Sequence, residues 1–206
     1  MFAAQYQQAP VPPGGAMIKR KWLQRYDDVP LAKHKFILQS WDTASKEGGA
    51  NDWSVCTTWS IVNNRFYLLD VTRQRVSYTE LRRLAAKLHR YSGSHQVLIE
   101  EAGIGYGLLD DLQSQGIPVR GVRPEGDKIV RLALQSPKFE AGLVYLPRQA
   151  SWLADFEAEL LSFPGGRNDD QVDSTTQALA NYESPFANAN ITRVMQSIMS
   201  GMSREY

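Results

Sequence analysis

Apolar and polar positions become regularly patterned from about residue 35 onward. Residues 35–42 form a short apolar run that ends in Asp42, and residues 52–62 alternate between apolar and polar side chains, as a half-buried strand does. Two asparagines at 63–64 are typical of a tight turn, and another apolar run follows at 65–73. The pattern predicts three strands, the last two of which form a hairpin.

The next segment has the spacing of an amphipathic helix. Residues 77–91 carry apolar side chains at positions 81, 84, 85 and 88, and Ser77 or Thr79 is a suitable N-terminal cap. Further along, the pattern predicts strands at 95–101, 117–122 and 143–147. It predicts helices at 105–116, 126–142, 151–163 and 168–183.

Two of these helices have predicted boundaries that the structure can test. The helix at 126–142 should remain helical only as far as Pro137, because proline lacks the amide hydrogen that a helix interior uses. The helix at 168–183 should begin at Asn168 as N-cap, with Gln171 in the position of a capping box.

The order of the elements indicates an α/β fold. We expect a mixed central sheet whose first three strands are antiparallel and whose later strands are parallel, with helices flanking it. Residues 1–30 combine Gln, Pro and Gly with a basic and aromatic patch, which predicts a linker or arm ahead of a domain at 31–183. The weakly patterned residues 184–206 are expected to be a flexible C-terminal tail.

Composition narrows the class of protein without naming a function. The 206 residues are 43% hydrophobic and 22% charged, which suits one globular domain with a full core. The formal net charge of +1 means that any nucleic-acid binding must come from local patches. Cys56 is the only cysteine, and no run approaches the length of a membrane span. We expect a soluble cytosolic protein with no membrane partner.

Acidic residues stand at the ends of predicted strands and at the start of the last helix. Asp42 ends the first strand, and Glu100 and Glu101 end the fourth. Asp169, Asp170 and Asp173 open the last helix, at spacings that place pairs of them on one helix face. Singly, each acid has an ordinary explanation, since acids favour helix N-termini. Jointly, they predict a carboxylate site at the carboxyl ends of the strands.

Such a site would suit hard divalent cations. Carboxylate oxygens favour Mg²⁺ or Mn²⁺, and clustered carboxylates are costly without a positive charge to neutralise them. Zinc is not indicated, because His34, His89 and His95 are too scattered for a metal motif. Two such ions can support hydrolysis of a phosphodiester.

Three stretches resemble a known family. They are ILQSWDTASKEGGANDWSVCTTW (37–59), VLIEEAGIGYGLLDDL (97–112) and FPGGRNDDQVDSTTQAL (163–179). They are similar to the C-terminal nuclease domain of the large terminase subunit of tailed bacteriophages, and the resemblance runs from about residue 5 to residue 180. It implies an RNase H-like fold and an endonuclease that cuts concatemeric double-stranded DNA when viral genome packaging starts and ends.

The resemblance also implies roles for the acids. Asp42 would bridge two Mg²⁺ or Mn²⁺ ions, Glu100 would be the second catalytic acid and Asp170 the third. Asp169 would be a neighbouring ligand or would hold a water. Asp173 is expected to play a supporting part, and Glu101 to face away because successive strand residues alternate. Asn168 stands where the family often has a histidine.

Lys128 and Arg131 are the best candidates for DNA contacts, because they lie three positions apart at a predicted helix start. No GxxxxGK(S/T) phosphate loop occurs in the chain, so the ATPase domain of such a subunit would be a partner absent from this chain. The portal protein and the small terminase subunit are further expected partners, in the bacterial host cytoplasm at the procapsid portal.

Two other interpretations stay open at this point. The acidic helix start would also suit another RNase H-like nuclease, such as a junction resolvase or a transposase, and cutting of branched rather than linear DNA would distinguish it. Alternatively, the chain is a catalytically silent domain that docks on the portal or motor. In that case, replacing Asp42 would leave its function unchanged.

Overall fold

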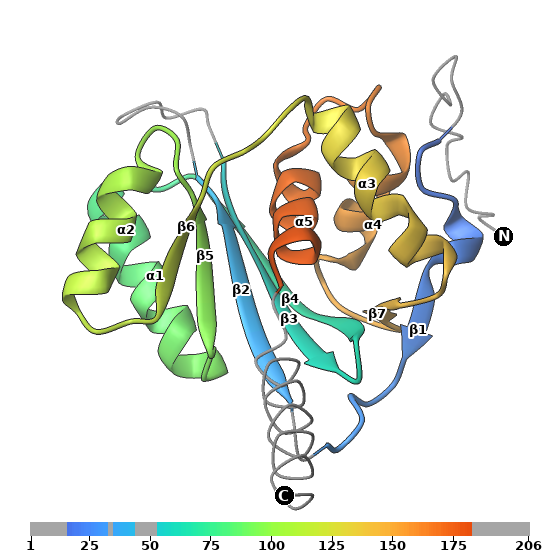
Figure 1. The fold of residues 1–206 in the computed structure, drawn as a ribbon, viewed down its shortest axis with the longest axis horizontal. Coiled ribbons are helices and arrows are strands. Elements are labelled where there is room, and N and C mark those ends of the chain that lie inside the picture. The colour runs from blue at the N-terminus through green and yellow to red at the C-terminus, as the bar shows by residue number, and fades with distance from the viewer. Residues whose placement is uncertain (1–15, 33–34, 44–52, 183–206) are drawn as a thin grey trace, which may run out of the picture.

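A seven-stranded sheet forms the centre of the molecule (Figure 1). The computed structural model describes residues 16–32, 35–43 and 53–182. The strands are β1 (Gln24–Tyr26), β2 (Phe36–Asp42), β3 (Ser54–Val62), β4 (Arg65–Gln74), β5 (Gln96–Glu100), β6 (Val119–Val122) and β7 (Val144–Pro147). The helices are the 3-10 helix η1 (Arg20–Trp22), α1 (Tyr78–Ser92), α2 (Gly105–Ser114), α3 (Lys128–Glu140), α4 (Leu153–Ser162) and α5 (Asp170–Asn181).

The sheet is mixed, as the sequence predicts. Its strand order is β1-β7-β4-β3-β2-β5-β6. Strands β2, β3 and β4 pair antiparallel, β5 and β6 continue from β2 in parallel, and β7 and β1 continue in parallel from β4. The prediction of an antiparallel start followed by parallel strands is therefore confirmed.

Strand β1 was not predicted. It has only three residues, which is too short for a periodic pattern, and it exists because it pairs with β7 at the edge of the sheet. Ile18 and Leu23, just before it, are buried in the main apolar core. This part of the predicted arm thus packs on the sheet, while residues 1–15 and the tail at 184–206 lie outside the described residues.

Helices cover both faces of the sheet (Figure 1). An apolar cluster that includes Trp59, Leu98 and Phe156 joins one face to α3, α4 and α5. A second cluster that includes Trp41 and Leu108 joins the other face to α1 and α2. None of the helices in the described part of the chain is long and apolar enough to cross a membrane.

Local signals explain the predicted hairpin and the start of α1. Asn63 and Asn64 both have positive φ, 50° and 60°, as a tight turn between right-twisted strands requires. Of the two caps considered for α1, Ser77 is the one observed, and it forms a full capping box with Glu80.

Helix α3 corrects one predicted boundary. It does not end at Pro137 but continues to Glu140. Proline removes the hydrogen bond that the carbonyl of Ala133 would accept, but the hydroxyl of Ser136 donates to that carbonyl at 2.9 Å. A neighbouring side chain therefore satisfies the carbonyl that proline leaves without its usual donor.

Candidate functional site

Asp42 and Glu100 lie at adjacent carboxyl ends of two parallel strands. The β2–β5 register pairs Trp41 with Ile99, so Asp42 and Glu100 are the next position along each strand. Trp41 and Ile99 both belong to the core on the α1–α2 side. Because successive strand residues face opposite sides, Asp42 and Glu100 both point to the α5 side of the sheet. Trp41 therefore faces away from Asp42.

Helix α5 delivers the third group of acids to the same place. It packs against β2 and β3 through hydrogen bonds rather than apolar contacts alone. Ser174 donates to the carbonyl of Ser40 at 2.8 Å, and Gln177 donates to the hydroxyl of Ser40 at 2.9 Å. These bonds, made just after the first turn, hold α5 and with it Asp170 and Asp173 over the end of β2.

The acids share one electrostatic environment. Burial raises the pKa of Asp42 well above its ordinary value, and the negative charges of Glu100, Asp173 and Asp170 raise it further. Burial and Asp173 likewise raise the pKa of Glu100. Burial raises the pKa of Asp170, with Arg73 opposing the shift and Asp169 adding to it. Carboxylates from β2, β5 and α5 are thus close enough to repel one another.

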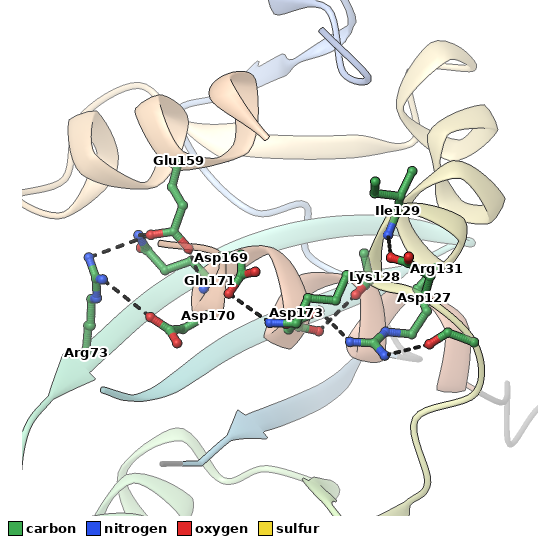
Figure 2. A network of polar contacts seen from close by, with 12 residues as sticks. Arg73, Asp127, Lys128, Ile129, Arg131, Glu159, Asp169, Asp170, Gln171 and Asp173 are labelled. Carbon is green, nitrogen blue, oxygen red and sulfur yellow. Dashed lines mark hydrogen bonds and ion pairs between the residues drawn. The ribbon is translucent and has the colours of Figure 1, made fainter. Parts of the chain in front are cut away.

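Lys128 and Arg131 partly neutralise this cluster (Figure 2). The Lys128 ammonium lies 2.8 Å from Asp169 Oδ1 and 2.7 Å from Asp173 Oδ2. Arg131 Nη2 lies 2.7 Å from Asp173 Oδ1. Burial lowers the pKa of Lys128, but hydrogen bonds to Asp169 and Asp173 raise it overall. The two predicted DNA-binding cations therefore lie directly beside the acids.

Asp173 has a larger part than the sequence indicates. Its side chain is only 5% exposed, and each of its oxygens meets one of the two cations. A buried carboxylate needs such partners, because its desolvation is otherwise uncompensated. Asp173 thus anchors Lys128 and Arg131 at the site.

Arg73 and Glu159 complete the surroundings of Asp170. Arg73 lies 3.4 Å from Asp170 and 3.6 Å from Glu159. Glu159 was not predicted, although one signal could have found it. It is an acid spaced three residues after Phe156 and four before Phe163, on the apolar face of the helix, where a charge requires a partner.

The predicted cap of α5 was wrong. The N-cap is Asp169, not Asn168, and no side chain of the N-cap residue bonds to the helix. Gln171 does not close a capping box but bonds to Glu159. The local sequence rule failed here because the amide that it would satisfy is taken by a residue from α4.

Glu101, His89 and His95 form hydrogen bonds with residues outside the acidic cluster. Glu101 accepts a hydrogen bond from Arg123 at 2.7 Å. His95 accepts one from the amide of Ile37, and His89 bonds to Ser94. His34 lies outside the described residues.

The donor chemistry of the site fits a hard divalent cation. It consists of Asp and Glu oxygens only, and mutual repulsion of the acids favours an added positive charge. Within residues 16–32, 35–43 and 53–182, however, no three side chains of His, Cys, Asp or Glu are placed so that they could hold one ion together. The side chains would have to close around an ion, since Lys128 and Arg131 now hold Asp169 and Asp173.

Large terminases of bacteriophages have folds similar to that of this chain. The chain resembles the large terminase nuclease of thermophilic phage G20c with bound cobalt, at 18% identity and a TM-score of 0.61, over 81% of this chain and 94% of that one. It resembles the magnesium-bound form of that nuclease at 17% identity and a TM-score of 0.59, over 81% and 94%. The large terminase of another thermophilic bacteriophage matches at 12% identity and a TM-score of 0.59, over 80% and 44%.

These likenesses show an RNase H-like fold of the kind found in terminase nucleases. A model of the terminase RNaseH-like domain matches residues 39–182, and the chain belongs to that family. No curated protein sequence matches it. The resemblance identified in the three sequence stretches is therefore confirmed.

Proposed function

We propose that this chain is the metal-dependent endonuclease domain of a viral DNA-packaging terminase. It would cut concatemeric double-stranded DNA when packaging starts and ends. The observation that carries the proposal is geometric: Asp42 and Glu100 end adjacent parallel strands, and Ser174 and Gln177 hold the start of α5, with Asp170, against the end of β2. Membership of the terminase RNaseH-like domain family supports it.

Each acid has a distinct part in the proposed reaction. Asp42, Glu100 and Asp170 would hold two Mg²⁺ or Mn²⁺ ions, with Asp169 beside them as a further ligand. Ions of this kind, when bound, activate water and stabilise the charge that develops on a phosphodiester. Asp42 ends β2, which pairs with β5 and packs against α5, and this position would suit a ligand shared by two ions.

Lys128 and Arg131 would bind the DNA backbone. Their cationic groups lie beside the acids, where phosphates flanking the cut would pass. Asp173 pairs with both side chains. When DNA binds, Lys128 and Arg131 would each contact a phosphate while remaining next to Asp173. Their charge would therefore position DNA without reading its sequence, since phosphate contacts carry no base information.

The partners belong to the same proposal. The ATPase domain of a large terminase, the portal protein and the small terminase subunit would act with this domain in the bacterial cytoplasm, at the procapsid portal. The longer terminase relative, of which this chain covers 44%, supports a further domain in the working assembly.

A plasmid-nicking assay tests the function. The purified chain is incubated with supercoiled plasmid in Mn²⁺, in Mg²⁺ and in EDTA, beside Asp42→Asn, Asp170→Asn and the exposed control Asp155→Asn. We expect cutting that requires a metal, survives in the control and is lost in both site variants. Equal activity in Asp42→Asn would refute the shared carboxylate site. Preferential cutting of a branched substrate would instead favour a resolvase-like nuclease.

A further inference from the structure

Helix α5 begins without a cap of its own. The first amides of a helix have no partner within it, and a Ser, Thr, Asp or Asn side chain at the N-cap usually accepts from one of them. Asp169 occupies that position with φ −140° and ψ 3°, but its side chain makes no such bond. Its carboxylate bonds instead to Lys128. The first turn of α5 must therefore be stabilised from elsewhere.

Glu159 of α4 supplies the missing acceptor (Figure 2). One carboxylate oxygen accepts from the backbone amide of Gln171 at 2.7 Å, and the other accepts from the side-chain amide of Gln171 at 2.7 Å. The Glu159 side chain is only 5% exposed, so both bonds form away from water. A negative charge there also suits the positive end of the α5 dipole.

Arg73 contacts both Glu159 and Asp170. Its Nη1 faces Glu159 at 3.6 Å and its Nη2 faces Asp170 at 3.4 Å, so one planar guanidinium spans both carboxylates. The guanidinium also lies 4.4 Å from the centre of the Trp53 ring, which limits its movement. Arg73 thus links the Asp170 side chain to a buried acid in another helix.

We propose that Glu159 is a positioning residue that caps α5 from outside and, through Arg73, sets the orientation of Asp170. Because Glu159 caps the helix, neither Asp169 nor Asp170 has to do so, and their carboxylates pair with Lys128 and Arg73 at the site instead. The inference rests on the proposed nuclease function for its catalytic consequence. Its structural part concerns the chain alone and can be tested without activity.

Glu157 offers a matched control on the same helix. It is 7% exposed, as Glu159 is, and it also pairs with arginine, accepting from Arg20 at 2.8 Å and from Arg25. Its partners lie in η1 and β1 rather than at the site. Glu157→Gln and Glu159→Gln therefore each remove a buried charge from α4, with side chains 10% and 5% exposed, but only the second touches α5.

The first measurement is hydrogen exchange of the Gln171 amide by NMR, without divalent cations. The second is calorimetric titration with Mn²⁺, and the third is the Mn²⁺ and DNA dependence of plasmid nicking. In Glu159→Gln we expect faster Gln171 exchange and roughly 10- to 100-fold weaker Mn²⁺ binding, the usual range for residues that orient metal ligands. The KM for DNA should stay unchanged. Glu157→Gln should lower the melting temperature and leave all three properties as in the unmodified chain.

Two outcomes would overturn the inference. One is ordinary Gln171 exchange and Mn²⁺ affinity in Glu159→Gln, and the other is an equal loss in Glu157→Gln, which would indicate general loosening of α4. If Glu159→Gln does not fold, Gln171→Met keeps the charge and removes one of the two bonds, and a smaller shift in the same direction is expected. Failure of the unmodified chain to cut DNA would count against the proposed function, while the exchange result would still decide whether Glu159 caps α5.

Discussion

The two faces of the sheet are covered in different ways. On one face, α1 and α2 bury apolar side chains such as Leu81, Ala85 and Leu112. On the other, α5 also buries a series of polar residues: Gln171, Asp173, Ser174, Thr175, Thr176 and Gln177. Both helical layers cover the sheet. Helix α1 bonds to β2 through Gln39 and Ser92, whereas α5 makes a set of buried bonds to β2 and β3 through Ser174 and Gln177.

The difference explains where the acids can be held in place. Apolar contacts are non-directional and tolerate small shifts of a helix. Hydrogen bonds require defined distances and angles, so the bonds from Ser174 and Gln177 to Ser40 hold α5 at one position along β2. We conclude that the α1–α2 face mainly stabilises the domain, whereas the α5 face determines the geometry of the site.

Asp42→Asn should show the largest effect on the α5 face, with activity and stability moving in opposite directions. Loss of a shared metal ligand should reduce cutting on the order of a thousandfold. Since the folded-state pKa of Asp42 is raised, its ionised form destabilises the fold near neutral pH, and a neutral side chain removes that cost. The melting temperature at neutral pH, without divalent cations, should rise. A fall would show that the Asp42 charge is well compensated.

Leu112→Ala tests the opposite face. Leu112 is fully buried between α2 and the sheet, and its truncation should cost about 2–5 kcal/mol of unfolding free energy. Urea unfolding measures this cost. At temperatures where the variant remains folded, the Mn²⁺ concentration for half-maximal cutting should be unchanged. A large shift in that concentration would contradict the division between the two faces.

Ser174→Ala should destabilise the fold less than Leu112→Ala does, but it should also alter metal binding at the site. Its hydroxyl bonds to the Ser40 carbonyl at 2.8 Å and to the Thr57 hydroxyl at 2.8 Å, and all of these groups are buried. Leaving buried partners unsatisfied should cost roughly 1–3 kcal/mol. Unlike Leu112→Ala, it should raise the Mn²⁺ requirement for cutting, because α5 loses a bond that holds it over β2. Equal Mn²⁺ requirements in Leu112→Ala and Ser174→Ala would contradict the view that only the α5 face determines the geometry of the site.

Features with local causes were predictable. The hairpin turn follows from two asparagines, the start of α1 from Ser77 and Glu80, and β2 from a short apolar run. The acids at the strand ends and the helix start were found in the same way, and the fold brings together the elements that carry Asp42, Glu100 and Asp170. Two features that were missed have no local cause: β1 pairs with β7, and α5 takes its cap from α4.

By itself, the sequence determined most of the helices and strands, the mixed α/β class and which acids end β2 and β5 or open α5. These properties depend on residues a few positions apart, where backbone preference and apolar spacing act directly. Only the tertiary structure decided that Lys128 and Arg131 pair with the α5 acids, that Glu159 caps α5 and that Arg73 joins Glu159 to Asp170. Those contacts link residues 12 to 97 positions apart, so they depend on how the helices pack on the sheet.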